Sequence, residues 1–357
     1  MPFAKSLVEK AGGYAIAPPN FVNFITALAA RISINLIRKE SSNSMPVTST
    51  DNPHSLLYGL ANGSVKALEH DEAIAANKTL ALQLQSRLED FWLLNSPDGL
   101  WGAKSARALN AYKHFQNLSE PGINPHIAAS LLNTKPTDLI PGFQLNGDWP
   151  SRTVMWINLH NQQISTNGNK GEINIVYFRG LDRKGEWNGN APFIWNDRRC
   201  VLVIKDKAPI FAGNWLATCD PGEYYWDNPM NQEGCADIKA WQYQAWSVGH
   251  HHGSTGDQLA LVQTGDITVL RGSDRLPDEG NNFSVDQHTT NNPDGDGFGE
   301  PVKGWSAGCM VGASSNEHYH EFMSLVQADP REKNAPGKYQ HWTTVINGNE
   351  FLDIFPG

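Results

Sequence analysis

Gly304-Trp305-Ser306-Ala307-Gly308-Cys309-Met310, together with an upstream His288 in Val285-Asp286-Gln287-His288, decides how the C-terminal half of this chain is interpreted. A cysteine attacks as its thiolate, and an ordinary thiol is mostly protonated at neutral pH, so it needs a neighbouring imidazole as its base. Gly308 permits a sharp backbone turn that points N–H groups toward a developing oxyanion. Seventeen residues separate His288 from Ser306. A loop of that length can join two neighbouring strands, so we expect His288 and Cys309 to meet.

The segment Ser306-Ala307-Gly308-Cys309-Met310-Val311 resembles the catalytic signature of L,D-transpeptidases of the YkuD type. In that family an upstream His is followed by Ser/Thr-His-Gly-Cys, then an apolar residue and Arg or Asn. Ser306, Gly308 and Cys309 match, whereas Ala307 replaces the second His and Val311 replaces the Arg or Asn. Residues 215–225 are similar to the family's segment in which a strand runs into Thr-Pro-x-Gly-x-Tyr/Phe. The resemblance covers residues 170–330.

This resemblance implies a mechanism in which His288 takes the proton of Cys309 and the thiolate attacks a peptide carbonyl of a peptidoglycan stem. Backbone N–H groups around Gly308 and Cys309 would stabilise the oxyanion. An amine (cross-linking) or water (cleavage) would then resolve the thioacyl-enzyme. Ser306 would position the loop, and the candidates for lining the substrate cleft are Tyr224 and Trp305. The resemblance implies that neither a metal nor an organic cofactor is required.

Residues 73–135 read as a small helical module. Thr79–Leu88 and Ala103–Gln116 carry apolar residues at helical spacing, and Asn95–Gly102 is the turn between them. The module resembles a three-helix peptidoglycan-binding domain, whose hallmarks are Leu-Gln-x-x-Leu, Asp-Gly-x-Phe/Trp-Gly-x-x-Thr/Ser and Phe-Gln. They correspond here to residues 84–88, 98–105 and 115–116. The resemblance makes Asp98 and Trp101 candidate substrate-binding residues; the alternative is a helical linker domain that merely packs.

The patterns predict an α+β chain in three parts. These are an N-terminal helical segment with a polar linker (1–72), the peptidoglycan-binding-like module (73–135) and a mainly β, L,D-transpeptidase-like domain (145–357). Short apolar runs bounded by Gly, Asp and Asn predict strands at 173–178, 200–204, 260–263 and 267–270. Helices are expected at 238–246 and 317–327, the second after an N-cap cluster at 314–316.

Composition and charge limit the class of partner. The 357-residue chain has a net charge of −9, which argues against nucleic acid because phosphate binding requires a basic face. Residues 21–37 are apolar but interrupted by polar side chains, which suits an amphipathic helix that docks on a protein, or secondarily a membrane surface, rather than a transmembrane span. The first residues do not resemble a signal peptide. The resemblance to cell-wall enzymes implies a location in the cell wall, the periplasm or an extracellular particle of phage or contractile-injection type, reached without a recognisable signal peptide.

Three further clusters carry alternatives. The side chains of His250-His251-His252 point in alternating directions and so do not converge on zinc, although one of them can line the cleft near His288. The segment 292–297 resembles half of a calcium loop, but Lys303 stands where a bidentate Glu is needed, so a flexible turn is predicted. Cys219 and Cys235 flank a loop and can pair in an oxidising compartment, or they can be free thiols.

Several functions are compatible with these patterns. The first is a cysteine acyltransferase or peptidase acting on peptidoglycan. The second is a non-catalytic wall-binding or assembly protein with a degenerate catalytic domain, which the replacements at Ala307 and Val311 favour. A metal-dependent amidase that uses the histidine cluster is the third. At the level of single residues, Cys309 can instead be a buried small hydrophobe, and Ser306 can instead be the nucleophile.

Overall fold

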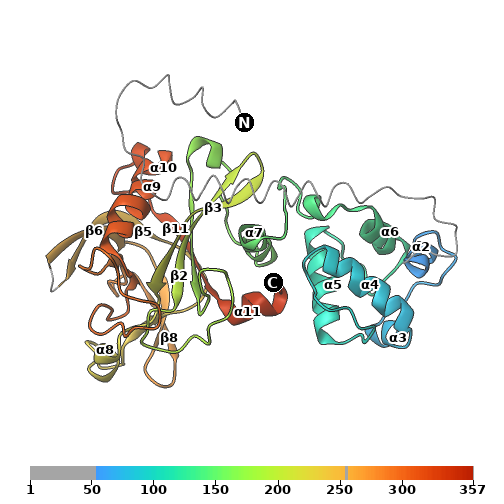
Figure 1. Ribbon diagram of the computed structural model, residues 1–357, viewed down its shortest axis with the longest axis horizontal. Helices are drawn as coiled ribbons and strands as arrows, with labels where there is room; N and C mark the ends of the chain where they lie inside the picture. The colour runs from blue at the N-terminus through green and yellow to red at the C-terminus, as the bar shows by residue number, and fades with distance from the viewer. Residues whose placement is uncertain (1–53, 254–255, 357) are drawn as a thin grey trace, which may run out of the picture. The chain divides into compact units, whose positions relative to one another are not determined.

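A computed structural model describes residues 54–253 and 256–356. The predicted amphipathic helix at 21–37 and the linker up to residue 53 lie outside the described residues. Residues 56–357 form one compact unit. As predicted, this unit is α+β, with a helical region followed by a mainly β region (Figure 1).

The helical region contains the two helices that the sequence predicts at 79–88 and 103–116. Its helices are α2 (Ser55–Ala61), α3 (Asp71–Ala75), α4 (Lys78–Asp90), α5 (Ala103–Phe115) and α6 (Pro125–Asn133). The α4 residue Gln85 is buried and holds the turn before α5. Its side-chain nitrogen donates to Asp98 Oδ1 at 3.0 Å, and its oxygen accepts the Gly99 N–H at 2.7 Å. Gly99 has φ +75°, which favours glycine there.

Eight strands close into a barrel in the order β1-β11-β5-β6-β9-β10-β3-β2. They are β1 (Asn174–Arg179), β2 (Asp197–Lys205), β3 (Ala208–Thr218), β5 (Gln242–Gly253), β6 (Gly256–Gln263), β9 (Gln287–Thr289), β10 (Met310–Gly312) and β11 (His341–Asn347). A separate three-stranded sheet contains β4 (Ala236–Ile238), β7 (Ile267–Arg271) and β8 (Leu276–Gly280). The four predicted strands correspond to β1, β2, β6 and β7, so all four are confirmed.

Two apolar cores lie on opposite faces of β1 and β2. In β1, Ile175 and Tyr177 belong to one core, and Val176 and Phe178 to the other. The second core also contains residues of the helical region and of two flanking helices, α7 (Trp149–Leu159) and α11 (Gly348–Ile354). Because successive side chains of a strand point to opposite faces, a strand buried on both faces reads as a continuous apolar run. This explains why β1 and β2 were visible in the sequence.

The helix predicted at 238–246 is wrong. Those residues form the end of β4, a turn, and the first half of β5. β5 pairs antiparallel with both β11 and β6, and Tyr243, Ala245 and Trp246 are buried in the barrel core. Aromatic side chains fit such a pleated, packed surface well. Pairing with the neighbouring strand β6 and with β11, which is distant in sequence, therefore outweighs the weak local preference for a helix.

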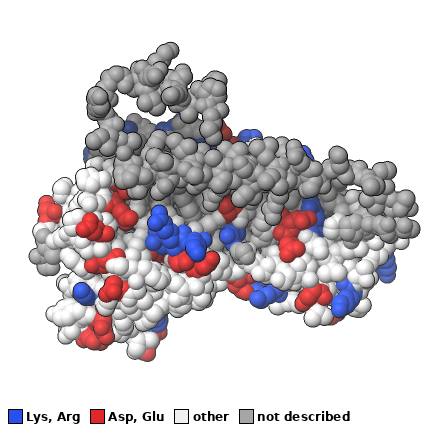
Figure 2. All heavy atoms as spheres, in the orientation of Figure 1, with Lys and Arg blue, Asp and Glu red and all other residues white. Residues whose placement is uncertain are grey.

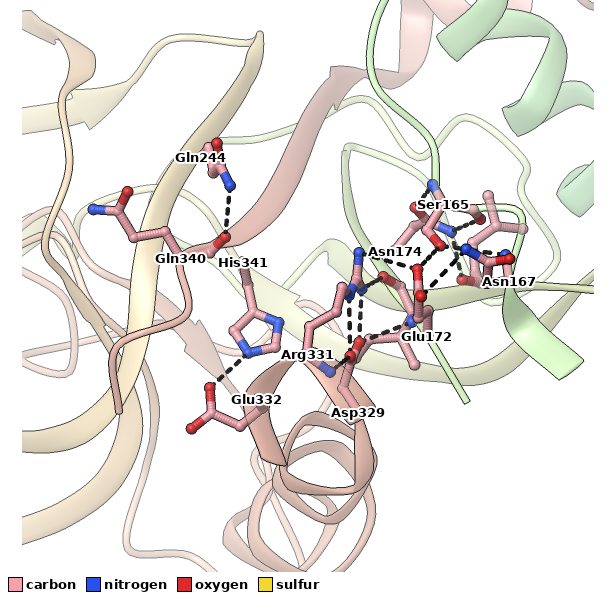
Figure 3. Close-up of polar contacts among 12 residues, drawn as sticks. Ser165, Asn167, Glu172, Asn174, Gln244, Asp329, Arg331, Glu332, Gln340 and His341 are labelled. Carbon is pink, nitrogen blue, oxygen red and sulfur yellow. Dashed lines mark hydrogen bonds and ion pairs between the residues drawn. The ribbon is translucent and has the colours of Figure 1, made fainter. Parts of the chain in front are cut away.

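The helix predicted at 317–327 is confirmed, with a π-helical first part (Glu317–Phe322) that continues into α9 (Met323–Ala328). Ser314 Oγ accepts the Glu317 N–H at 3.3 Å, as the predicted N-cap cluster requires. The next helix, α10 (Pro330–Asn334), is fixed to the start of β1 by a polar network (Figure 3). Asp329 Oδ2 accepts the Ile173 N–H at 3.0 Å, and Arg331 donates to the Ile173 carbonyl at 2.6 Å.

Three broader expectations can be compared with the described residues. All four cysteines are free thiols, so the pairing of Cys219 with Cys235 is absent. Within 54–253 and 256–356, no helix is both long and apolar enough to span a bilayer. On the face shown in Figure 2, acidic and basic side chains are interspersed.

Candidate active site

The ends of two neighbouring strands bring His288 and Cys309 to one place. β9 and β10 are parallel partners, with His288 paired to Val311, and Cys309 immediately precedes β10. The Met310 N–H donates to the Asp286 carbonyl at 2.9 Å, which continues the pairing past the strand ends. The long loop between the two strands therefore brings the chain back beside β9, next to His288, as its length predicts.

Gly308 and Ser306 shape the backbone before the cysteine. Gly308 has φ +134°, and a Cβ there would lie 2.7 Å from the Ala236 carbonyl oxygen of β4, so both conformation and space require glycine. Ser306 Oγ donates to the Cys309 carbonyl at 2.8 Å and accepts the Gly308 N–H at 3.2 Å. Because the Gly308 N–H is engaged in this way, the Cys309 N–H is the better candidate for an oxyanion donor.

Buried ion pairs hold β4, on which Gly308 rests, against the barrel. Arg179 at the end of β1 pairs with Asp237 of β4, and its guanidinium also lies 3.9 Å from Asp220. Asp237 has a second partner in Arg275, whose side chain is 45% exposed. A buried carboxylate without a cation would be strongly destabilising, so Arg179 keeps β4 in place.

The Cys309 thiol is buried and neutral at rest. Only 7% of the residue is exposed. Its Sγ donates to the Ser284 carbonyl at 3.3 Å and accepts the Asp286 N–H at 3.4 Å. Burial, together with the nearby Asp286 carboxylate, raises the pKa of Cys309 to about 12.

His288 is also neutral, and its tautomer follows from its hydrogen bond. Its Nδ1 lies 2.9 Å from the Thr289 carbonyl, which can only accept, so the proton is on Nδ1 and Nε2 keeps its lone pair. Burial, with a smaller contribution from the His251 imidazole, lowers the pKa of His288 to about 3. The free Nε2 is thus suited to receive the thiol proton during attack, rather than to hold a preformed thiolate–imidazolium pair.

His251 stacks directly on His288, so one member of the histidine triplet does lie beside His288, as the alternation of a strand allows. The two imidazole rings are 4.0 Å apart and 3° from parallel. His251 Nδ1 donates to Asp286 Oδ2 at 2.8 Å, and Asp286 Oδ1 accepts the Gln263 N–H at 2.8 Å. The flanking residues His250 and His252 pair instead with Asp257. The sequence analysis did not identify Asp286, although it lies two residues before His288.

The two predicted cleft-lining aromatics, Trp305 and Tyr224, both lie near the loop that carries Ser306 and Cys309. Trp305 is half-buried and packs in a small cluster that includes Cys309. Tyr224 belongs to the short helix α8 (Glu223–Asp227) and is 60% exposed. The start of α8 is attached to the loop because the Gly222 N–H donates to the Ser306 carbonyl at 2.8 Å.

Asp98 and Trp101 lie in the helical region and make contacts within it. Asp98 caps its own turn by accepting the Leu100 N–H at 2.8 Å. The Trp101 indole donates to Asp71 at 2.9 Å, and Asp71 borders a polar hollow of about 330 Å³ that Lys113 and Glu72 also line. Substrate binding by Asp98 and Trp101 stays a prediction.

The low pKa of His288 makes a prediction about stability against pH. The pKa of the His288 imidazole is lowered from an ordinary 6.5 to about 3 in the folded state. Between these pH values the unfolded chain therefore binds a proton that the folded chain does not. The stabilisation is fully present above pH 6.5 and is lost as pH falls toward 3; it amounts to at most roughly 5 kcal/mol. We expect the free energy of unfolding in urea to fall less steeply from pH 7 to pH 4 in His288→Gln than in the wild type. Equal slopes would contradict the assignment.

Comparisons with known proteins give two distant structural likenesses. No family model matches the chain, and no curated protein matches it. An L,D-transpeptidase from Xylanimonas cellulosilytica is 14% identical, with a TM-score of 0.23, over 74% of this chain and 92% of that one. A fused Zn-dependent amidase/peptidase with a peptidoglycan-binding domain from Clostridium acetobutylicum is 12% identical, with a TM-score of 0.21, over 74% and 94%.

Proposed function

We propose that this protein is a peptidoglycan-targeting cysteine enzyme that acts on stem peptides through a thioacyl intermediate. The observation that carries the proposal is the convergence of a thiol and an imidazole. The Sγ of Cys309 and a ring nitrogen of His288 lie within 4.8 Å of each other. Catalytic hydrogen bonds are often long before substrate binds, so this separation is compatible with proton transfer.

The neutral resting state shapes the proposed chemistry. As the sulfur of Cys309 attacks the peptide carbonyl, its proton passes to His288 Nε2, and the new C–S bond forms while the carbonyl oxygen becomes negative. The Cys309 N–H would stabilise that oxyanion. The proton then goes from His288 to the leaving amine, and an amine or water attacks the thioester to regenerate the thiol. Transfer and hydrolysis differ only in this last nucleophile.

The helical module would retain the enzyme on its polymeric substrate. Binding of this module to peptidoglycan would raise the local concentration of stem peptides without adding a chemical step. This role places the protein in the cell wall or periplasm, or on a phage- or injection-type particle that meets the wall from outside. In the latter setting cleavage is the more useful outcome.

A second candidate function, a non-catalytic wall-binding or assembly protein, is favoured by one observation. The Cys309 thiol is nearly fully buried and already donates to the Ser284 carbonyl. A sulfur in that setting can serve simply as a small packing group. The two candidates make opposite predictions about what the protein does to the wall.

Digestion of purified peptidoglycan, with muropeptides identified by mass, separates the two candidates. We expect the wild type to generate cleaved or newly cross-linked stem peptides and Cys309→Ala to generate none, since the thioacyl step has no other nucleophile. Sedimentation with sacculi is the control, and both proteins should bind equally. Binding without any change in the muropeptides would leave the wall-binding candidate.

A further inference from the structure

We propose that Cys309, His288 and His251 together form a binding site for a zinc-type divalent cation, and that the bound ion silences the nucleophile. One ligand atom from each of the three residues lies within 4.8 Å of the other two. The set of one thiolate and two imidazoles is the donor chemistry that Zn²⁺ prefers, whereas Mg²⁺ and Ca²⁺ take oxygen ligands. The binding claim is independent of the proposed enzyme activity; only the silencing rests on it.

The hydrogen bonds of the two imidazoles are those of zinc ligands. His288 donates its Nδ1 proton to the Thr289 carbonyl at 2.9 Å, and His251 donates its Nδ1 proton to the Asp286 carboxylate at 2.8 Å. Metal-binding histidines characteristically donate their second N–H to a carbonyl or carboxylate, which fixes the tautomer and orients the ring. With Nδ1 engaged on each ring, Nε2 is the nitrogen left to bind the ion, and the Asp286 carboxylate orients the His251 ring.

The geometry needs only a small closure. Zinc bonds of about 2.3 Å to sulfur and about 2.0–2.1 Å to nitrogen put tetrahedral donors roughly 3.3–3.6 Å apart. The donors must therefore approach by about an ångström, and the two stacked rings must open from their parallel arrangement. Of the three residues His251 is the least buried, with 18% of its side chain exposed, so it is the one best able to rotate onto an entering ion.

Binding has a defined proton balance. The Cys309 thiol loses its proton to solvent as the metal–sulfur bond forms, so one proton leaves for each ion bound and affinity rises with pH. Three protein ligands leave the fourth position to water. The ion occupies the sulfur and the His288 lone pair at once, so the nucleophile and its base are both blocked until a chelator removes the metal.

Cobalt titration of the chelator-treated, reduced protein tests the site, because Co²⁺ reports a thiolate ligand by a near-ultraviolet charge-transfer band. We expect the band in the wild type, its loss on addition of Zn²⁺ but not of Mg²⁺, and its absence in Cys309→Ser. His251→Gln should weaken binding by at least about 10–100-fold. His250→Gln is the matched control, since that neighbouring histidine is exposed and pairs with Asp257 instead, and it should bind as the wild type does.

Two results would overturn the proposal: no charge-transfer band in the wild type, or equal cobalt affinity in the wild type and His251→Gln. Circular dichroism establishes that each variant is folded, and the partly exposed His251 keeps the test open if changes at the buried positions do not fold. Muropeptide digestion by the metal-free protein is run in parallel. Activity without metal binding would contradict the metal site but support the enzyme proposal. Metal binding without activity would support the metal site but contradict the enzyme proposal.

Discussion

Replacing His288 by Gln is expected to slow formation of the thioacyl-enzyme by about 10²–10⁴-fold, the usual contribution of a positioned general base. Glutamine keeps a polar side chain of similar reach but cannot take the thiol proton. Because burial holds the pKa of Cys309 near 12, very little thiolate forms at neutral pH without such a base. The measurement is the single-turnover rate of acylation by a synthetic stem peptide in the presence of a chelator. The acylated protein is detected by the mass of the intact chain.

The stacked pair of imidazoles makes the controls for this prediction informative. His250→Gln changes an exposed histidine of β5 and should leave the rate unchanged. His251→Gln removes the neighbour but not the base, so its rate should fall less than that of His288→Gln. If His251→Gln is the slower of the two variants, the base is His251 held by Asp286, and our assignment to His288 is wrong.

Replacing Arg179 by Met is expected to lower the free energy of unfolding by about 3–5 kcal/mol, which is the cost of breaking a buried ion pair from one side. Arg179, Asp237 and Asp220 are all buried. Without Arg179, Asp220 would lose its cation, and Asp237 would keep only the partly exposed Arg275. Urea unfolding at pH 7 measures the effect. The loss should also loosen β4, on which Gly308 rests.

Arg275→Met is the matched control for this second prediction. It removes the other partner of Asp237, but the Arg275 side chain is 45% exposed, so water can replace it. Because Arg275 is partly exposed and Asp237 keeps Arg179, we expect its loss to cost less, about 1 kcal/mol, as for pairs open to solvent. Similar, small losses in both variants would show that the buried pair does not hold β4 in place.

The sequence contained enough to predict the local elements but not the closure of the barrel. β1 and β2 were recognised because both of their faces are buried. β11 was missed because it pairs in parallel with β1, a strand that lies more than 160 positions earlier in the chain. The first half of β5 was assigned to a helix for a related reason, since its pairing with the distant strand β11 could not be inferred from local pattern.

The candidate site divides in the same way. The small loop residues Ser306 and Gly308 and the spacing to His288 predicted the meeting of thiol and imidazole, because that information is local. The stacking of His251 on His288 depends on where β5 runs in the barrel. From the sequence, the alternation of side chains along a strand indicated only that one of the three histidines could line the cleft. The role of Asp286 as its hydrogen-bond partner required the fold itself.

The most direct test of the central claim is the mass of the intact protein after incubation with purified stem peptides in the presence of a chelator. Our account predicts an adduct of one acyl group that maps to Cys309, is released by hydroxylamine as a thioester should be, and is absent in Cys309→Ala. A folded, metal-free wild-type protein that binds sacculi but never carries an acyl group on Cys309 would contradict it.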